Sequence, residues 1–300
     1  MNEETSGGRT GNRISRVGLG TVQFGINYGI SNVRGKVPRN EVADVLSAAR
    51  QSGILWLDTA SAYGQAEQAL GDLDAAKQGF RIVSKTMPKT DSTQPIIDQV
   101  RRSMDLLRVE KLDGLLVHQA RDLNGPDGTA LWNTLEHLKA SGDVSRIGIS
   151  AYYEDDPLAL VQSFEPDLLQ IPTSILDQRL IRNGDLAAIR ARGVSIHARS
   201  VFLQGLLFLT LDQLPPKLQQ FHGLLSQIKE QIRECGSTPL AAAIAFVLDR
   251  PEIDVAVVGA TSVTEITEIL QAAEKPHPSM DWRNLSIDDP LALTPSLWHT

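Results

Sequence analysis

The chain has 300 residues, of which 42% are hydrophobic and 22% charged, an ordinary composition for a globular protein with one large α/β domain or two small ones. No apolar run approaches the roughly 20 residues that a membrane-spanning helix needs, and a formal net charge of -7 without a concentrated basic stretch argues against nucleic-acid binding. With Cys235 as its one cysteine, the chain can form no intramolecular disulfide, so a reducing cytoplasm is the expected location. A metal site built from cysteine thiolates is implausible for the same reason, and no metal is expected.

Apolar runs typical of strands alternate with helix-like segments along the chain. In chain order, the strand candidates are RVGLG (16–20), GILWLD (53–58), FRIVSK (80–85), KLDGLLVH (111–118), SRIGIS (145–150), PDLLQIP (166–172), GVSIHARS (193–200) and IDVAVVG (253–259). A loop is expected after the first of them. Helices are expected at 39–52, from near Tyr63, at 93–107, at 128–141, behind the next three strand candidates and at 263–274.

Eight strand–helix units in about 260 residues match a (β/α)8 barrel. Strand interiors such as LLV and VAVV are apolar without alternation, as expected when both faces of a parallel sheet are covered. A doubly wound dinucleotide-binding sheet is disfavoured, because GLGTVQFG carries glycines at 18, 20 and 25, which miss the G-x-G-x-x-G spacing. The sequence therefore predicts an α/β fold, a (β/α)8 TIM barrel in a single domain over residues 14–275.

Both ends of the chain are expected to lie outside this barrel. Residues 1–13 are polar and lack an apolar core, so they predict a disordered N-terminal tail rather than a signal peptide. Residues 276–300 are proline-rich and predict an irregular C-terminal tail packed on the barrel.

Four polar side chains fall at or just beyond three successive strand ends: Asp58, Tyr63, Lys85 and His118. Each has an ordinary explanation when taken singly, such as a helix cap, a packing tyrosine, a lysine reaching water or a core histidine. In a (β/α)8 barrel, however, the carboxyl ends of the strands surround one opening, where active sites lie. Their coincidence there predicts a shared catalytic role.

These four groups suit the reduction of a carbonyl. A free tyrosine has a pKa near 10, and a lysine ammonium beside it favours the phenolate and lowers that pKa. Asp58 is expected to hold Lys85 charged and pointed inward, and His118 to hydrogen-bond a substrate oxygen. None of the four can carry a hydride, so a cofactor is required.

The motifs GLGTVQFG, DTASAYG, VSKT, LLVHQ, IGIS and VVGATS resemble the signature blocks of the aldo-keto reductases, in the same order, from about Arg16 to Ala273. The resemblance implies a barrel that binds NAD(P)H at its carboxyl-end mouth. It implies Tyr63 as proton donor, Lys85 and Asp58 as the pair that tunes it, and His118 as the group that orients substrate.

The resemblance also implies cofactor contacts beyond Asp58. In chain order these are Gly20, Thr21, Ser150, Gln170, Arg199, Ser200, Phe202, Gln204, Gly259, Thr261 and Ser262. Candidate walls of a substrate pocket are Phe24, Tyr28, Tyr152 and Trp298.

Three departures from the family pattern bear on the cofactor. Ala151 stands where the family often has asparagine, which removes one partner of the nicotinamide carboxamide. Arg199 replaces the aromatic residue that usually stacks on the nicotinamide; its guanidinium plane can stack too, and its charge would favour the reduced cofactor. The loop at 259–270 contains no cation for an adenosine 2′-phosphate and two acids, Glu265 and Glu268, so NAD(H) is expected over NADP(H).

Two functions are consistent with these residues. The first is NAD(P)H-dependent reduction of a small aldehyde or ketone, including a sugar-derived one, because the chain resembles a bacterial branch associated with polysaccharide and nucleotide-sugar pathways. The second is an NADH-sensing regulatory protein with the same fold that acts through a protein partner. The intact set of four favours the enzyme, and loss of activity in Tyr63→Phe would distinguish the two.

Overall fold

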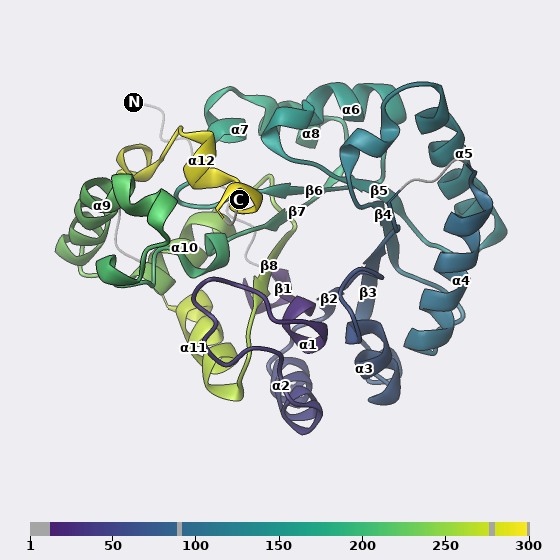
Figure 1. Ribbon diagram of the computed structural model, residues 1–300, viewed down its shortest axis with the longest axis horizontal. Coiled ribbons are helices and arrows are strands. Elements are labelled where there is room, and N and C mark those ends of the chain that lie inside the picture. Colours follow the sequence, from purple (N-terminus) through teal and green to yellow (C-terminus); the bar gives the residue numbers. More distant parts are fainter. Residues whose placement is uncertain (1–12, 89–91, 276–279, 299–300) are drawn as a thin grey trace, which may run out of the picture.

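A closed barrel of eight parallel strands forms the centre of the protein, with the strands in the order of the sequence (Figure 1). The structure is a computed structural model that describes residues 13–88, 92–275 and 280–298. The strands are β1 Val17–Gly20, β2 Trp56–Asp58, β3 Arg81–Lys85, β4 Gly114–Val117, β5 Ile147–Ser150, β6 Leu168–Pro172, β7 Ser195–Arg199 and β8 Val255–Gly259. Each lies within the run predicted for it, and the (β/α)8 fold is confirmed. The tail expected at 1–13 lies, apart from Arg13, outside the described residues.

Helices surround the strands (Figure 1). They are α2 Arg39–Gln51, α3 Ala66–Asp72, α4 Gln94–Leu107, α5 Pro126–Ser141, α6 Pro157–Phe164, α7 Arg179–Arg182, α8 Asp185–Ala191, α9 His222–Glu234, α10 Pro239–Leu248 and α11 Val263–Glu274. The helix predicted near Tyr63 begins three residues later, because a tight turn precedes it. The segment after β1 was expected to be a loop, but it includes the one-turn helix α1 Val22–Gly25.

Side chains fill the interior of the barrel towards the amino ends of the strands, and the barrel opens at their carboxyl ends. Val83, Leu116 and Leu168 form a small buried cluster inside it, against the Trp56 ring. A Cβ on Gly148 would lie 2.0 Å from the Leu168 carbonyl oxygen, so this inward position requires glycine for the backbones to approach. Because this part of the barrel is filled, a ligand has room only at the mouth.

Register brings distant parts of the sequence together at that mouth. Gly20 pairs with Asp58 on one side and with Gly259 on the other, and Ser150 pairs with Gln170. The predicted strand-end residues of β1, β2, β5, β6 and β8 therefore lie at one rim.

The C-terminal segment packs beside this rim. Where an irregular run was expected, the described residues 280–298 contain three short helical segments: Trp282–Leu285, α12 Pro290–Leu293 and Pro295–Leu297. Its Ile287 N–H donates to the Leu176 carbonyl, which ties the segment to the loop after β6. Within the described parts of the chain, no helix is long and apolar enough to cross a membrane.

Candidate active site

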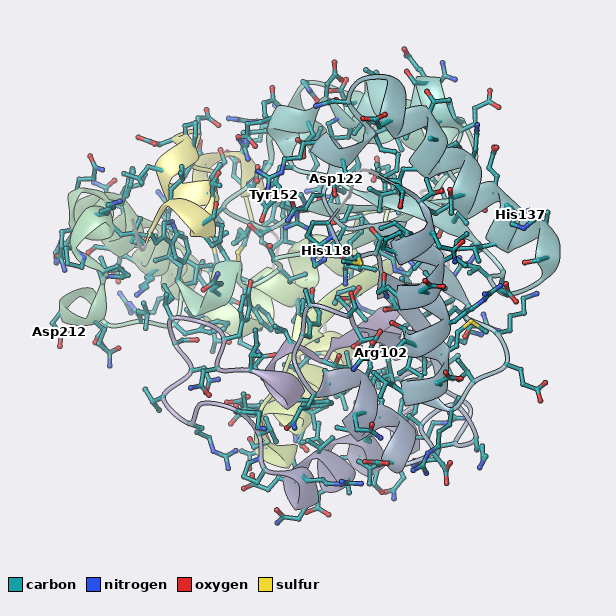
Figure 2. The ribbon with its side chains drawn as sticks, turned by 45° about the vertical axis from the view of Figure 1, so that its right-hand side comes forward. Arg102, His118, Asp122, His137, Tyr152 and Asp212 are labelled. Carbon is teal, nitrogen blue, oxygen red and sulfur yellow. The ribbon has the colours of Figure 1, made fainter. Side chains whose placement is uncertain are left out.

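A cavity of about 1080 Å³ opens at the carboxyl ends of the strands, and Asp58, Tyr63, Lys85 and His118 all line it. This volume slightly exceeds the ~300–1,000 Å³ of ordinary ligand pockets, so it has room for an extended ligand. Figure 2 places His118 near the centre of the molecule and Tyr152 close by, whereas His137 lies on the outer side of α5. No group of three or more potential metal ligands is found among the residues that the structure describes.

Lys85 is the centre of the four. Its Nζ donates to Asp58 Oδ2 at 2.7 Å and to the Thr59 carbonyl oxygen at 2.8 Å, and only 1% of the lysine is exposed. The same Nζ lies 4.9 Å from the centre of the Tyr63 ring. The Tyr63 and His118 rings meet edge to face with centroids 6.0 Å apart. The structure therefore brings together the four side chains that the sequence singled out.

The backbone around Tyr63 explains its position. Tyr63 lies in a turn between β2 and α3, closed by hydrogen bonds from Tyr63 N to the Ala60 carbonyl and from Ala66 N to the Tyr63 carbonyl. Gly25 of α1 packs directly on this turn, where a Cβ would lie 1.6 Å from the Tyr63 carbonyl oxygen. The glycine that ends the GTVQFG motif thus lets α1 press the tyrosine turn against the barrel mouth.

The pKa of Tyr63 is set by two opposing effects. Burial raises this pKa above its usual value of 10, and the opposing effect of Lys85, the next largest, does not cancel it. Lys85 lowers the pKa as expected, but the net direction is upward, because desolvation of the phenolate outweighs its attraction to the ammonium. For Lys85, burial lowers the pKa, but Asp58 and Tyr63 together raise it more, so the net direction is upward. At neutral pH, the phenol keeps its proton and the lysine keeps its charge.

His118 and Gln170 complete the polar network. Burial, followed by the charge of Lys85, lowers the pKa of His118 to about 4, so its imidazole is neutral at pH 7. Gln170 Nε2 donates to Asp58 Oδ1 at 2.6 Å across the barrel mouth. Asp58 is thus held by Lys85 on one oxygen and by Gln170 on the other.

Most of the predicted cofactor residues line the same cavity. These are Gly20, Thr21, Asp58, Ser150, Gln170, Arg199, Ser200, Phe202, Gln204, Gly259 and Thr261. Ser262 does not, because its hydroxyl accepts the Glu265 N–H at 3.2 Å and caps α11. Gln170, expected at the carboxamide of the nicotinamide, gives its own amide to Asp58.

Only two of the four expected substrate-pocket residues line the cavity, namely Tyr28 and Tyr152. Phe24 is 2% exposed and packs into the main core from α1. Trp298 is 3% exposed, and its Nε1 donates to the Leu291 carbonyl within the C-terminal segment. Both are packing residues, and the prediction for them is wrong.

Two cavity-side features were missed from the sequence. Gln23 lines the cavity, and its Oε1 is buried without a hydrogen-bond partner, which suits a ligand hydroxyl. Arg34, in the loop between α1 and α2, donates from Nη1 to the Thr261 carbonyl oxygen at 2.8 Å and pairs with Glu41. The Gln in GTVQFG was a usable signal for the first. Nothing local indicated that the second would reach the loop after β8.

The backbone after β7 carries unusual conformations at the cavity wall. Ser200, Leu203 and Gln204 have φ values of 57°, 45° and 53°, in the left-handed region that non-glycine residues rarely adopt. Ser31 of the loop after α1 bonds the Gln204 carbonyl through both its N–H and its hydroxyl, at 3.4 and 3.2 Å. Strained backbone held by tertiary contacts is typical of ligand-binding loops.

The chain matches the description Aldo/keto reductase family over residues 16–287. It belongs to the aldo-keto reductase family. The family and the names of its relatives make this aldo-keto reductase an oxidoreductase of carbonyl compounds, and such enzymes use a nicotinamide cofactor without a metal.

Two curated relatives carry specific names. The 6-dehydroglucose reductase of Agrobacterium fabrum is 28% identical over 263 residues, covering 80% of this chain and 84% of the relative. The NADH-specific methylglyoxal reductase of Escherichia coli is 25% identical over 304 residues, covering 88% and 91%. Among solved structures, the holo form of an aldo-keto reductase from Bacillus halodurans has a TM-score of 0.74 at 20% identity and covers 90% of each chain, a likeness of fold.

Proposed function

We propose that this aldo-keto reductase reduces a small aldehyde or ketone, including a sugar-derived one, to an alcohol with NADH, and that Tyr63 donates the proton. The observation that carries the proposal is the buried Lys85–Asp58 pair at 2.7 Å beside the Tyr63 ring, facing neutral His118 across the same cavity.

The residues at the mouth fit a nicotinamide dinucleotide. Gln23 Oε1, a buried polar atom without a partner, belongs to a residue of the cavity wall. Gly259 leaves the space that Gln23 occupies, since a Cβ there would lie 2.8 Å from Gln23 Nε2. Gly20, Thr21 and the β7 loop would hold the cofactor from the remaining sides. A bound NADH or NADPH supplies the hydride for the carbonyl carbon.

The protein's own groups handle the proton. Tyr63 holds a proton at neutral pH and transfers it to the carbonyl oxygen as negative charge develops there, and Lys85 then stabilises the phenolate. Neutral His118 hydrogen-bonds the same oxygen and fixes its position beside the phenol. Burial of the site strengthens both interactions, because the surrounding dielectric is low.

The expected preference for NADH rests on the loop after β8. Glu268 lines the cavity there, and Glu265 Oε2 accepts from the Thr261 N–H at 2.6 Å. Arg34 reaches this loop, but its guanidinium already pairs with Glu41. Arg233 pairs with Glu230 and is not part of the cavity wall. The NADH-specific name of the Escherichia coli relative points the same way.

The test is Tyr63→Phe, assayed by NADH oxidation with a panel of aldehydes. Removal of the proton donor is expected to lower the rate by at least ~10², while NADH binding, measured by fluorescence, stays nearly unchanged. Full activity in Tyr63→Phe would rule out this mechanism. If the unmodified protein binds NADH but reduces no carbonyl on the panel, the regulatory function through a protein partner becomes the better account.

A further inference from the structure

Arg199 is a cation of the cavity wall that no carboxylate neutralises among the described residues. It ends β7 and is half-buried. Its Nη2 donates to the Ala151 carbonyl oxygen at 3.2 Å, its Nη1 to the Ser200 hydroxyl at 3.4 Å, and its Nε is buried without a partner. A guanidinium carries five N–H donors, so most of this fork is unused.

The Tyr152 ring packs against this fork. The Arg199 Cζ lies 4.1 Å from the centre of the Tyr152 ring, and both residues line the cavity. One face of the guanidinium is therefore covered by the tyrosine, which limits the stacking on nicotinamide that the sequence suggested. The remaining N–H groups of Nη1 and Nη2 are held in place at low entropic cost, which favours recognition of an anion.

Arg179 shows how the same fold neutralises an arginine with a structural role. It is 8% exposed, donates to Asp177 through two nitrogens at 2.9 Å and pairs with Glu154 at 2.6 Å. Arg199 has no such acids, although it lies beside the catalytic groups. Placing an uncompensated cation there is costly unless a ligand supplies the negative charge.

The acids around the substrate end of the cavity are already engaged. Asp58 pairs with Lys85, Glu154 pairs with Arg179, and Asp155 accepts the Tyr152 N–H at 2.7 Å. None of them lies within salt-bridge distance of Arg199. Among the residues that the structure describes, none supplies a counter-charge for this guanidinium.

We propose that the carbonyl substrate carries a carboxylate or a phosphate group, which the remaining Nη N–H groups of Arg199 bind beside Tyr152. This inference rests on the proposed carbonyl reductase function and names its substrate class. The reaction is unchanged: the carbonyl carbon gains a hydride, its oxygen gains the Tyr63 proton, and the anionic group takes no part.

The pyrophosphate of the cofactor is the other source of an anion. Two observations favour the substrate. The Arg199 fork is held towards the end of β5 by Ala151 and Tyr152. Arg199 also lines the same cavity as Tyr63 and His118, the groups proposed to contact the reacting carbonyl. The nicotinamide end of a dinucleotide has no anionic group of its own to offer there.

The experiment compares 4-carboxybenzaldehyde with its methyl ester, two probes of similar size that differ in charge. The ratio of their kcat/KM values is measured for the unmodified enzyme, Arg199→Met and Arg199→Lys. Because each ratio is compared with that of the unmodified enzyme, the intrinsic reactivity of the two aldehydes cancels. The ratio is expected to fall at least tenfold in Arg199→Met, equivalent to about 1.4 kcal/mol, and to recover partly in Arg199→Lys.

Arg121→Met is the matched control. Arg121 also lines the cavity, but it is exposed and its Nε donates to Gln119 at 2.8 Å, so solvent screens its charge. Its substitution is expected to preserve the ratio. If the ratio of kcat/KM values falls equally in Arg121→Met and Arg199→Met, the preference for the charged aldehyde arises from the overall positive potential of the cavity. That result would overturn the assignment to Arg199. An unchanged ratio in Arg199→Met, with or without weaker NADH binding, would overturn it as well.

A binding measurement separates this inference from the proposed function. Calorimetric titration of the NADH complex with 4-(hydroxymethyl)benzoate and with its methyl ester requires no turnover. Tighter binding of the carboxylate that is lost in Arg199→Met supports the charge preference even if no aldehyde is reduced, an outcome that would defeat only the proposed reaction. Equal binding of the two alcohols would defeat the inference and leave the reaction intact.

Discussion

Burial of His197 inside the barrel predicts how the stability of the fold depends on pH. His197 lies on β7 two residues before Arg199 and is 2% exposed, and its ring meets Trp56 edge to face at 5.5 Å. Its Nε2 is buried without a hydrogen-bond partner. Burial, followed by the charge of Arg146, lowers the pKa of His197 to about 4.

This lowered pKa makes stability depend on pH with a definite sign. In the unfolded chain a histidine titrates near pH 6.5, whereas His197 in the folded barrel stays neutral down to about pH 4. Between these values the unfolded state binds the extra proton, so the contribution is complete above pH 6.5 and is lost as the pH falls. From pH 7 to pH 5, the free energy of unfolding is expected to drop by about 2 kcal/mol from this one residue.

Urea unfolding at pH 7 and pH 5, followed by tryptophan fluorescence, measures the drop. His197→Gln should lose about 2 kcal/mol less than the unmodified protein between the two pH values, whatever its stability at pH 7. His137→Gln, a change at an exposed histidine on the outside of α5 (Figure 2), is the control and should lose as much as the unmodified protein. If His197→Gln retains the full pH dependence, the buried neutral histidine is not its source.

Three predictions concern the active site. Lys85→Met should lower the rate of carbonyl reduction by at least ~10², because the phenolate left by proton donation loses its cation; reduction at the unmodified rate would contradict this role. The kcat/KM for reduction should stay flat from pH 8 down to about 5.5 and fall below that as His118, with its pKa of about 4, is protonated; an inflection near 6.5 would show an exposed imidazole instead. Glu268→Lys should shift the ratio of the Kd values for NADH and NADPH towards NADPH by about tenfold, or 1.4 kcal/mol, measured by fluorescence titration. If the unmodified protein already prefers NADPH by more than that factor, the 2′-phosphate site does not lie at the loop after β8.

The fold and the four central residues could be predicted because both depend on local signals. Apolar runs fix the strands, and the carboxyl ends of parallel strands in a barrel share one rim. Asp58 and Lys85 therefore had to lie near each other once the barrel was inferred. The position of Tyr63 at the same rim could be predicted because it lies five residues after Asp58, within the turn formed by the DTASAYG motif.

Other features depend on contacts between distant residues and could not be predicted. The bond from Gln170 to Asp58 joins residues 112 positions apart and exists only because the barrel closes. Phe24 and Trp298 face the core rather than the cavity, an orientation set by α1 and the C-terminal segment. The direction of the Tyr63 pKa is a balance between burial and Lys85, and burial is not visible in a motif.

The charges at the mouth connect these observations. Asp58 and Lys85 form a neutral pair, and Tyr63 and His118 are uncharged at pH 7, so the four central side chains carry no net charge before reaction. Proton transfer leaves a phenolate on Tyr63. The ammonium of Lys85 is already paired with the Asp58 carboxylate, so it neutralises this new charge only in part. Arg199 is the further cation that lowers the pKa of Tyr63. Its loss should therefore slow reduction of the neutral ester as well. Only the ratio between the charged and the neutral aldehyde isolates its contact with an anionic substrate.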